Sequence, residues 1–178
     1  GYVMRAVYPG SFNPPTVGHI EIVNSAINRF KVNEIHLVIS EIALGKEKLT
    51  RPSVSDRVEI LEKSLSSIPE ASVLKTSKQL IADIAEGYDV VILGADKWKQ
   101  LTELAFYDDE AHMRDCLRRL PRLAVAPRNN IPIPKEILLN VTEAISPISS
   151  SDVRNGKFEW MTKEAFGIGK ERGLWGLA

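Results

Sequence analysis

Residues able to bind phosphate lie between positions 8 and 19, where an apolar run ends and a helical pattern begins. Gly10 lets the backbone approach a ligand closely, and Ser11 offers a hydroxyl and a backbone N–H. Gly18 and His19 stand at the expected helix start, where free N–H groups and the helix dipole favour anions. The imidazole of His19 can donate to phosphate as charge moves onto a leaving group. Together these residues favour a phosphate site over a loop shaped only by its glycines and prolines.

A second polar run, from Ile148 to Arg154, has the same character. Ser149, Ser150 and Ser151 are consecutive hydroxyls at an expected helix start, where they can cap the helix and bind phosphate together. Arg154 follows about one turn later, and its guanidinium matches phosphate with two parallel hydrogen bonds. Alone, such a run is more often an ordinary helix cap; paired with the first motif, it favours a functional site.

A third group follows the apolar run that ends at Gly94. Gly94 lets a ligand lie against the backbone, and Asp96 can accept hydrogen bonds from ribose hydroxyls. Leaving a buried Asp96 carboxylate unpaired would cost about 1–3 kcal/mol, which favours a ribose-bearing ligand. Trp98 can stack on a ring, although a tryptophan near a helix start more often packs in the core.

Short apolar runs and helical patterns alternate along the chain, which predicts an α/β fold. The expected architecture is a Rossmann-like, doubly wound parallel sheet with helices on both faces. In such sheets ligands bind at the carboxyl ends of the strands, near the topological switch point, where the three motifs are expected to meet. The expected strands are residues 4–8, 34–40, 71–75, 89–93, 123–126 and 137–141, and the expected helices are 18–30, 53–65, 80–85, one or two within 96–120, and one from 149 onward.

Composition bounds the class of protein. The chain has 178 residues, 44% of them hydrophobic, which suits one domain over residues 1–178, with residues 1–3 before Met4 expected to be a remnant of expression. Lys+Arg and Asp+Glu both number 23, so no net field attracts nucleic acid or a membrane surface. The single cysteine, Cys116, and the lack of a signal peptide or long apolar run indicate a cytoplasmic protein. No zinc-ligand spacing is present, and a homo-oligomer is compatible with the sequence.

The first and last motifs resemble the two signatures of the nucleotidyltransferase superfamily, (H/T)xGH and ISSTxxR. They stand here as Thr16-Val17-Gly18-His19 and as the run from Ile148 to Arg154, with serine at position 151 in place of threonine. The resemblance implies that Thr16, His19 and Arg154 are catalytic and contact the phosphates of ATP, accompanied by Mg²⁺. It places these further residues in the ATP site: Gly10, Ser11, Phe12, Gly18, Ile148, Ser149, Ser150 and Ser151.

The acceptor motifs point to two subfamilies. Gly94-Ala95-Asp96 resembles nicotinate and nicotinamide mononucleotide adenylyltransferases, whereas Tyr8 to Phe12 looks most like pantetheine-phosphate adenylyltransferase. The arginine-glycine-leucine-arginine run of the pantetheine enzymes is missing, as is the later tryptophan of the mononucleotide enzymes. The resemblance favours adenylyl transfer from ATP to nicotinate or nicotinamide mononucleotide, in NAD biosynthesis. The alternatives are pantetheine phosphate as acceptor, in coenzyme A biosynthesis, cytidylyl transfer, and a non-catalytic nucleotide-binding protein.

Both subfamilies place a lysine after the second strand and an arginine in the following helix. The resemblance therefore implies that Lys46 or Lys48 meets the triphosphate or the acceptor phosphate, with Lys46 assigned to catalysis and Lys48 and Arg57 to the acceptor. The choice between the two lysines stays open, and a solvated charged loop is the alternative. The expected partners are ATP and a small phosphorylated acceptor, with neither nucleic acid nor membrane.

Overall fold

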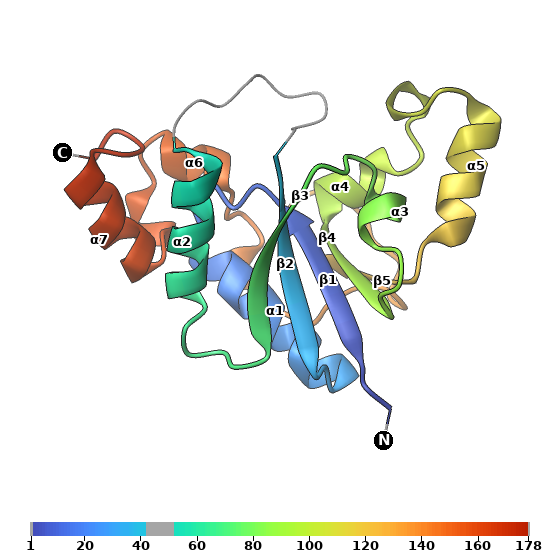
Figure 1. Cartoon of the computed structure of the whole chain (residues 1–178), viewed down its shortest axis with the longest axis horizontal. Coiled ribbons are helices and arrows are strands. Elements are labelled where there is room, and N and C mark those ends of the chain that lie inside the picture. The colour runs from blue at the N-terminus through green and yellow to red at the C-terminus, as the bar shows by residue number, and fades with distance from the viewer. Residues whose placement is uncertain (1, 42–51, 178) are drawn as a thin grey trace.

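The computed structural model describes residues 2–41 and 52–177 and has the predicted architecture (Figure 1). Five parallel strands form one sheet in the order β3-β2-β1-β4-β5. Their order confirms the doubly wound pattern, because the chain moves outward from β1 to β3 and then returns beside β1 to build the other half. The strands are β1 (Arg5–Gly10), β2 (Glu34–Ser40), β3 (Ala71–Thr76), β4 (Val90–Gly94) and β5 (Arg122–Ala126).

Helices cover both faces of the sheet. They are α1 (Val17–Phe30), α2 (Val54–Ser64), α3 (Ile81–Ile84), α4 (Ala95–Gln100), α5 (Glu110–Arg119), α6 (Ser150–Arg154) and α7 (Lys163–Arg172), with single 3-10 turns at Leu104–Phe106, Glu143–Ile145 and Phe158–Trp160. Helix α2 is capped by Ser53, whose side chain accepts from the backbone N–H of Asp56. Two α-helices, α4 and α5, occupy the stretch expected to hold one or two helices, with the 3-10 turn at Leu104–Phe106 between them.

Side chains along each strand point alternately to the two faces of the sheet, so the apolar core is divided between those faces. Ala6 and Tyr8 of β1 pack with α1 and α2, whereas Val7, between them, packs with α3 and α4 on the opposite face. A third apolar cluster joins α2 to the C-terminal part of the chain, through Ile60, Val153 and other buried residues. Figure 1 shows α2, α6 and α7 together at one side of the sheet. The C-terminal helices are thereby held beside the first half of the fold.

The strand expected at residues 137–141 is wrong. Only Leu138 pairs with the sheet, in an isolated parallel bridge to Val125. That bridge uses the Ile137 carbonyl and the Leu139 N–H. The Arg29 side chain of α1 donates to the carbonyls of Glu136 and Leu138, which β5 does not use, so α1 holds this segment from its other side. The apolar pattern reflected burial rather than strand pairing, since Leu139 is 1% exposed.

Among the described helices, none has the length and apolar character needed to cross a bilayer.

Candidate active site

The switch point lies between β1 and β4, which pair at the centre of the sheet. β1 ends at Gly10 and β4 ends at Gly94, so the first and third sequence motifs begin at adjacent strand ends. Two hydrogen bonds bring in the last motif: Ser150 Oγ donates to the Pro14 carbonyl at 2.8 Å, and Arg154 Nη1 donates to the Asn13 carbonyl at 2.6 Å. The structure therefore gathers all three motifs at the edge where ligands bind in this class of fold.

Helix α1 begins at a reciprocal cap between Thr16 and His19. The Thr16 hydroxyl accepts from the His19 backbone N–H at 3.2 Å, and the Thr16 N–H donates to His19 Nδ1 at 3.0 Å. Thr16 is only 2% exposed, so the structure gives it a capping role, and its contact with phosphate stays a prediction. The cap fixes where the free N–H groups of the first turn of α1 point, and these can bind an anion.

The same cap determines the tautomer of His19. Because Nδ1 accepts a hydrogen bond, the proton of the neutral ring is on Nε2, which is then a donor. The ring packs edge-on against Phe12, with centroids 4.9 Å apart, and burial lowers the pKa of His19 to about 4. His19 is therefore a neutral hydrogen-bond donor at pH 7 rather than a cation.

Gly10, Phe12 and Gly18 have packing roles in the structure. A Cβ on Gly10 would lie 2.9 Å from the Phe12 ring, so this glycine makes room for that ring rather than only for a ligand. Phe12 is 2% exposed, and its φ of 46° turns the chain inward. A Cβ on Gly18 would lie 3.5 Å from the Ile148 side chain, an ordinary contact distance, which shows that the start of α1 lies beside the last motif. Their predicted contacts with ATP remain untested predictions.

The hydroxyls of the last motif are divided between two roles. Ser149 caps α6 by accepting from the Asp152 N–H, and Ser150 holds the Pro14 carbonyl. Ser151 and Arg154 are exposed, which leaves the rest of the Arg154 guanidinium accessible to a ligand beside its bond to Asn13. The predicted contacts of Ser149, Ser150 and Ser151 with phosphate stay predictions, and Ser151 and Arg154 are the exposed members of the set.

Arg57 lies in the interior below the same loop. It is 6% exposed, Nη1 donates to the Ser11 carbonyl at 3.4 Å, and Nε has no partner within residues 2–41 and 52–177. Burial lowers the pKa of Arg57, although an arginine stays charged at any physiological pH. The structure thus places a buried cation behind Ser11, where it raises the local positive potential.

The third motif differs from its sequence-based interpretation. The Asp96 side chain is 60% exposed and pairs with Arg128 Nη1 at 3.4 Å, so the expectation of a buried carboxylate is wrong. The cause is its place at the start of α4, which projects from the end of β4 toward solvent. At Gly94 nothing lies within 4 Å of the position a Cβ would take, and its contact with an acceptor stays a prediction.

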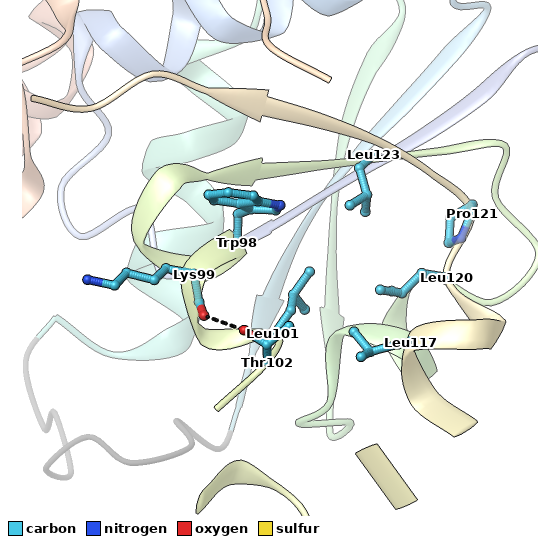
Figure 2. Close-up of a pocket in the computed structure, with 8 residues that line it drawn as sticks. All are labelled: Trp98, Lys99, Leu101, Thr102, Leu117, Leu120, Pro121 and Leu123. Carbon is cyan, nitrogen blue, oxygen red and sulfur yellow. Dashed lines mark hydrogen bonds between the residues drawn. The ribbon is translucent and has the colours of Figure 1, made fainter. Parts of the chain in front are cut away.

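Trp98 belongs to a pocket of about 380 Å³ between α4, α5 and the start of β5 (Figure 2). Leu101, Leu117 and Leu123 share the lining, and Trp98 packs against the core cluster on that face. None of the lining residues comes from the first or last motif. The packing interpretation of Trp98 is therefore supported, and stacking on an acceptor ring stays a prediction.

Sequence analysis did not single out two basic residues at this edge. Arg128 follows the end of β5 and pairs with Asp96, and Lys97 follows Asp96 in α4, where burial lowers the pKa of Lys97. The feature of the sequence that could have identified them is a basic residue shortly after the end of an expected strand. Lys46 and Lys48 lie outside the described residues.

Free helix N-terminal N–H groups and an exposed arginine at the switch point of a parallel sheet are the arrangement expected of a nucleotide-binding α/β protein. The chain belongs to the cytidylyltransferase-like family, whose model matches residues 7–156. This membership confirms the superfamily inferred from the two signatures.

Curated relatives include two adenylyltransferase types. Phosphopantetheine adenylyltransferase of Nautilia profundicola is 33% identical over 89 residues, which are 50% of this chain and 54% of the relative. The corresponding protein of Micrococcus luteus is 32% identical over 92 residues, 51% of this chain and 55% of the relative. This chain therefore spans about half the length of both. Probable nicotinate-nucleotide adenylyltransferase of Sulfurimonas denitrificans is 28% identical over 155 residues, 79% of this chain and 80% of the relative.

A solved structure shares the fold along the whole chain. Plasmodium falciparum nicotinic acid mononucleotide adenylyltransferase complexed with NaAD superposes with a TM-score of 0.71 and covers 99% of each chain. The sequences are 15% identical, so this likeness supports the architecture alone.

Proposed function

We propose that this protein is an adenylyltransferase that moves AMP from ATP to a phosphate monoester and releases pyrophosphate. The observation that carries the proposal is the neutral His19 at the start of α1, at the switch point of the sheet, with the exposed Arg154 bound to the loop that leads into that helix. The family membership and the adenylyltransferase relatives support the same reaction.

The reaction needs residues that position the substrates and donate hydrogen bonds, and it needs no residue that abstracts a proton. A phosphate monoester has its second pKa near 6, so it is largely a dianion at pH 7 and needs no general base. Its oxygen attacks the α-phosphorus of ATP, and the bond to the β-phosphate oxygen breaks with its electron pair leaving on pyrophosphate. His19 Nε2, Arg154 and the first N–H groups of α1 would stabilise the charge that develops there.

Mg²⁺ enters this proposal only with the nucleotide. Among the described residues, no group of three His, Cys, Asp or Glu side chains is arranged to hold a metal ion. We therefore derive no step through a protein-bound metal. Mg²⁺ bound to the ATP phosphates would neutralise part of their charge, as it commonly does in phosphoryl transfer.

We propose nicotinate or nicotinamide mononucleotide as the acceptor. Asp96 and Arg128 pair just beyond the ends of β4 and β5, and Gly94 beside them leaves open space. The carboxylate can accept from ribose hydroxyls, which pantetheine phosphate lacks, and the guanidinium can bind an anionic group of the acceptor. The relative matched over most of its length is a probable nicotinate-nucleotide adenylyltransferase, which favours the same choice.

The test is pyrophosphate release with ATP, Mg²⁺ and each acceptor in turn: nicotinate mononucleotide, nicotinamide mononucleotide and phosphopantetheine. A parallel series with CTP tests cytidylyl transfer, and ATP alone gives the background of hydrolysis. Faster release with phosphopantetheine would overturn the acceptor but leave adenylyl transfer intact. Release with none of them, together with measurable ATP binding, would favour a non-catalytic nucleotide-binding protein.

A further inference from the structure

The loop between β1 and α1 is held by the C-terminal part of the chain. Three consecutive carbonyls accept hydrogen bonds from it: Asn13 from Arg154, Pro14 from Ser150, and Pro15 from the Thr162 backbone N–H. Two of these loop residues are prolines, which lack an N–H, so the loop has few donors with which to order itself. Its conformation therefore depends on donors from α6 and from the start of α7.

A fourth bond reaches the loop from beyond the last helix. Trp175 Nε1 donates to Asn13 Oδ1 at 2.7 Å. Asn13 is 1% exposed, and its Nδ2 has no partner within the described part of the chain. An indole N–H can only donate, so this bond fixes both the place and the orientation of the Asn13 amide.

The surroundings of Trp175 fit this contact closely. A Cβ on Gly169 would lie 2.9 Å from the Trp175 ring, so the glycine in α7 provides the space that the ring occupies. The φ of Trp175 is 54°, a left-handed conformation that a bulky side chain rarely adopts. The preceding Leu174 is 3% exposed and anchors the segment in the third apolar cluster. These contacts together hold an unfavourable backbone conformation that directs the indole to Asn13.

We propose that Trp175 is a positioning residue for the active site, acting through Asn13. The side-chain amide of Asn13 fixes the loop that leads to Thr16 and His19. The backbone carbonyl of the same Asn13 accepts the hydrogen bond from Arg154. Without the indole donor, the amide loses its one side-chain partner in the described residues, and the loop can relax away from the geometry that aligns His19 with Arg154. The inference rests on the proposed function, because turnover is one of its readouts.

The test compares Trp175→Phe with Trp160→Phe. The first variant keeps an aromatic ring near Gly169 and removes the N–H donor together with part of the indole volume. Trp160 packs at the same third cluster, and its indole N–H has no hydrogen bond to a described residue, so its replacement controls for loss of indole packing. We expect Trp175→Phe to lower kcat about tenfold, the factor that corresponds to one lost hydrogen bond, with the KM for ATP within about threefold. The melting temperature should fall by no more than about 4 °C.

Amide hydrogen exchange across residues 11–19 supplies a readout that needs no turnover. We expect about tenfold faster exchange there in Trp175→Phe and wild-type exchange in Trp160→Phe. Wild-type kcat and loop exchange in Trp175→Phe would overturn the proposal, as would equal losses in both variants. If the wild type adenylates no acceptor, the proposed function fails, while loop exchange still decides whether Trp175 orders the loop.

A double variant tests whether the effect passes through Asn13. If it does, the double variant Asn13→Ala with Trp175→Phe should have the same kcat and the same amide exchange rates in the loop as the slower single variant. The reason is that both substitutions remove the same hydrogen bond. Additive losses would mean that Trp175 acts by another route and would overturn the proposal.

Discussion

The His19 imidazole has two roles in the structure, and substitutions can separate them. Nδ1 accepts from the Thr16 N–H and completes the cap of α1, whereas Nε2–H is left to donate to phosphate. His19→Ala removes both roles. His19→Gln and His19→Glu keep an acceptor at the third helical position, which is where a capping box places Gln or Glu.

The expected magnitudes differ for the two roles. Losing the cap should cost about 0.5–2 kcal/mol, which for a chain of this size lowers the melting temperature by about 1–8 °C in His19→Ala. Losing one transition-state donor should lower kcat by about 10²–10³. His19→Gln and His19→Glu should keep most of the stability. His19→Glu should turn over more slowly than His19→Ala, because it places a negative charge where the phosphates bind.

The assay pairs thermal unfolding with initial rates of pyrophosphate release at saturating ATP and acceptor. Stability of His19→Gln no higher than that of His19→Ala would refute the cap assignment. Turnover of His19→Ala within a few-fold of wild type would refute the donor assignment. Faster turnover of His19→Glu than of His19→Ala would show that the imidazole does not face the phosphates.

Four other outcomes follow from the same geometry. Arg154→Lys keeps the charge but loses the fork, so kcat should fall at least about tenfold in the pyrophosphate assay, and a wild-type rate would make Arg154 a surface residue. Gly94→Ala should raise the acceptor KM without loss of melting temperature, because its Cβ meets nothing in the free protein. Gly10→Ala should instead lose about 1–3 kcal/mol in denaturant unfolding, because its Cβ meets the buried Phe12 ring. Acidification from about pH 6.5 to about pH 4 should destabilise the wild type more than His19→Gln in urea titrations, because the unfolded chain binds a proton at this histidine before the folded chain does.

The sequence predicts the sheet well because each strand is a short apolar run that ends at a turn. Parallel strands buried on both faces, such as β4 with Val90 to Leu93, have this signature. The failure at residues 137–141 has a physical reason that no pattern contains. The segment makes a single bridge to β5 and is held on its other side by Arg29 of α1, a residue more than one hundred positions earlier in the chain.

The structure brings together the three segments that the sequence singled out, but the structural roles of their residues could not be assigned from the sequence. Glycine, serine and histidine at a strand end indicate a phosphate site. The same residue types also cap helices or leave room for packing, and only the three-dimensional structure distinguishes these roles. Phe12 and Gly10 pack against each other, and Ser149 and Ser150 hold backbone groups. Arg128 went unnoticed because its pairing with Asp96 joins segments that are distant in sequence.

The N-terminal and C-terminal segments have different roles at the candidate site. The β1–α1 segment carries the donors proposed to face a ligand, and it follows the central strand of the sheet, which fixes its position. The C-terminal segment supplies donors to the carbonyls of that loop, and its own position is set by packing against α2. A substitution in α6 or α7 can therefore lower turnover without touching a substrate, because a shift of about 1 Å in a catalytic group can cost on the order of 10²-fold in rate.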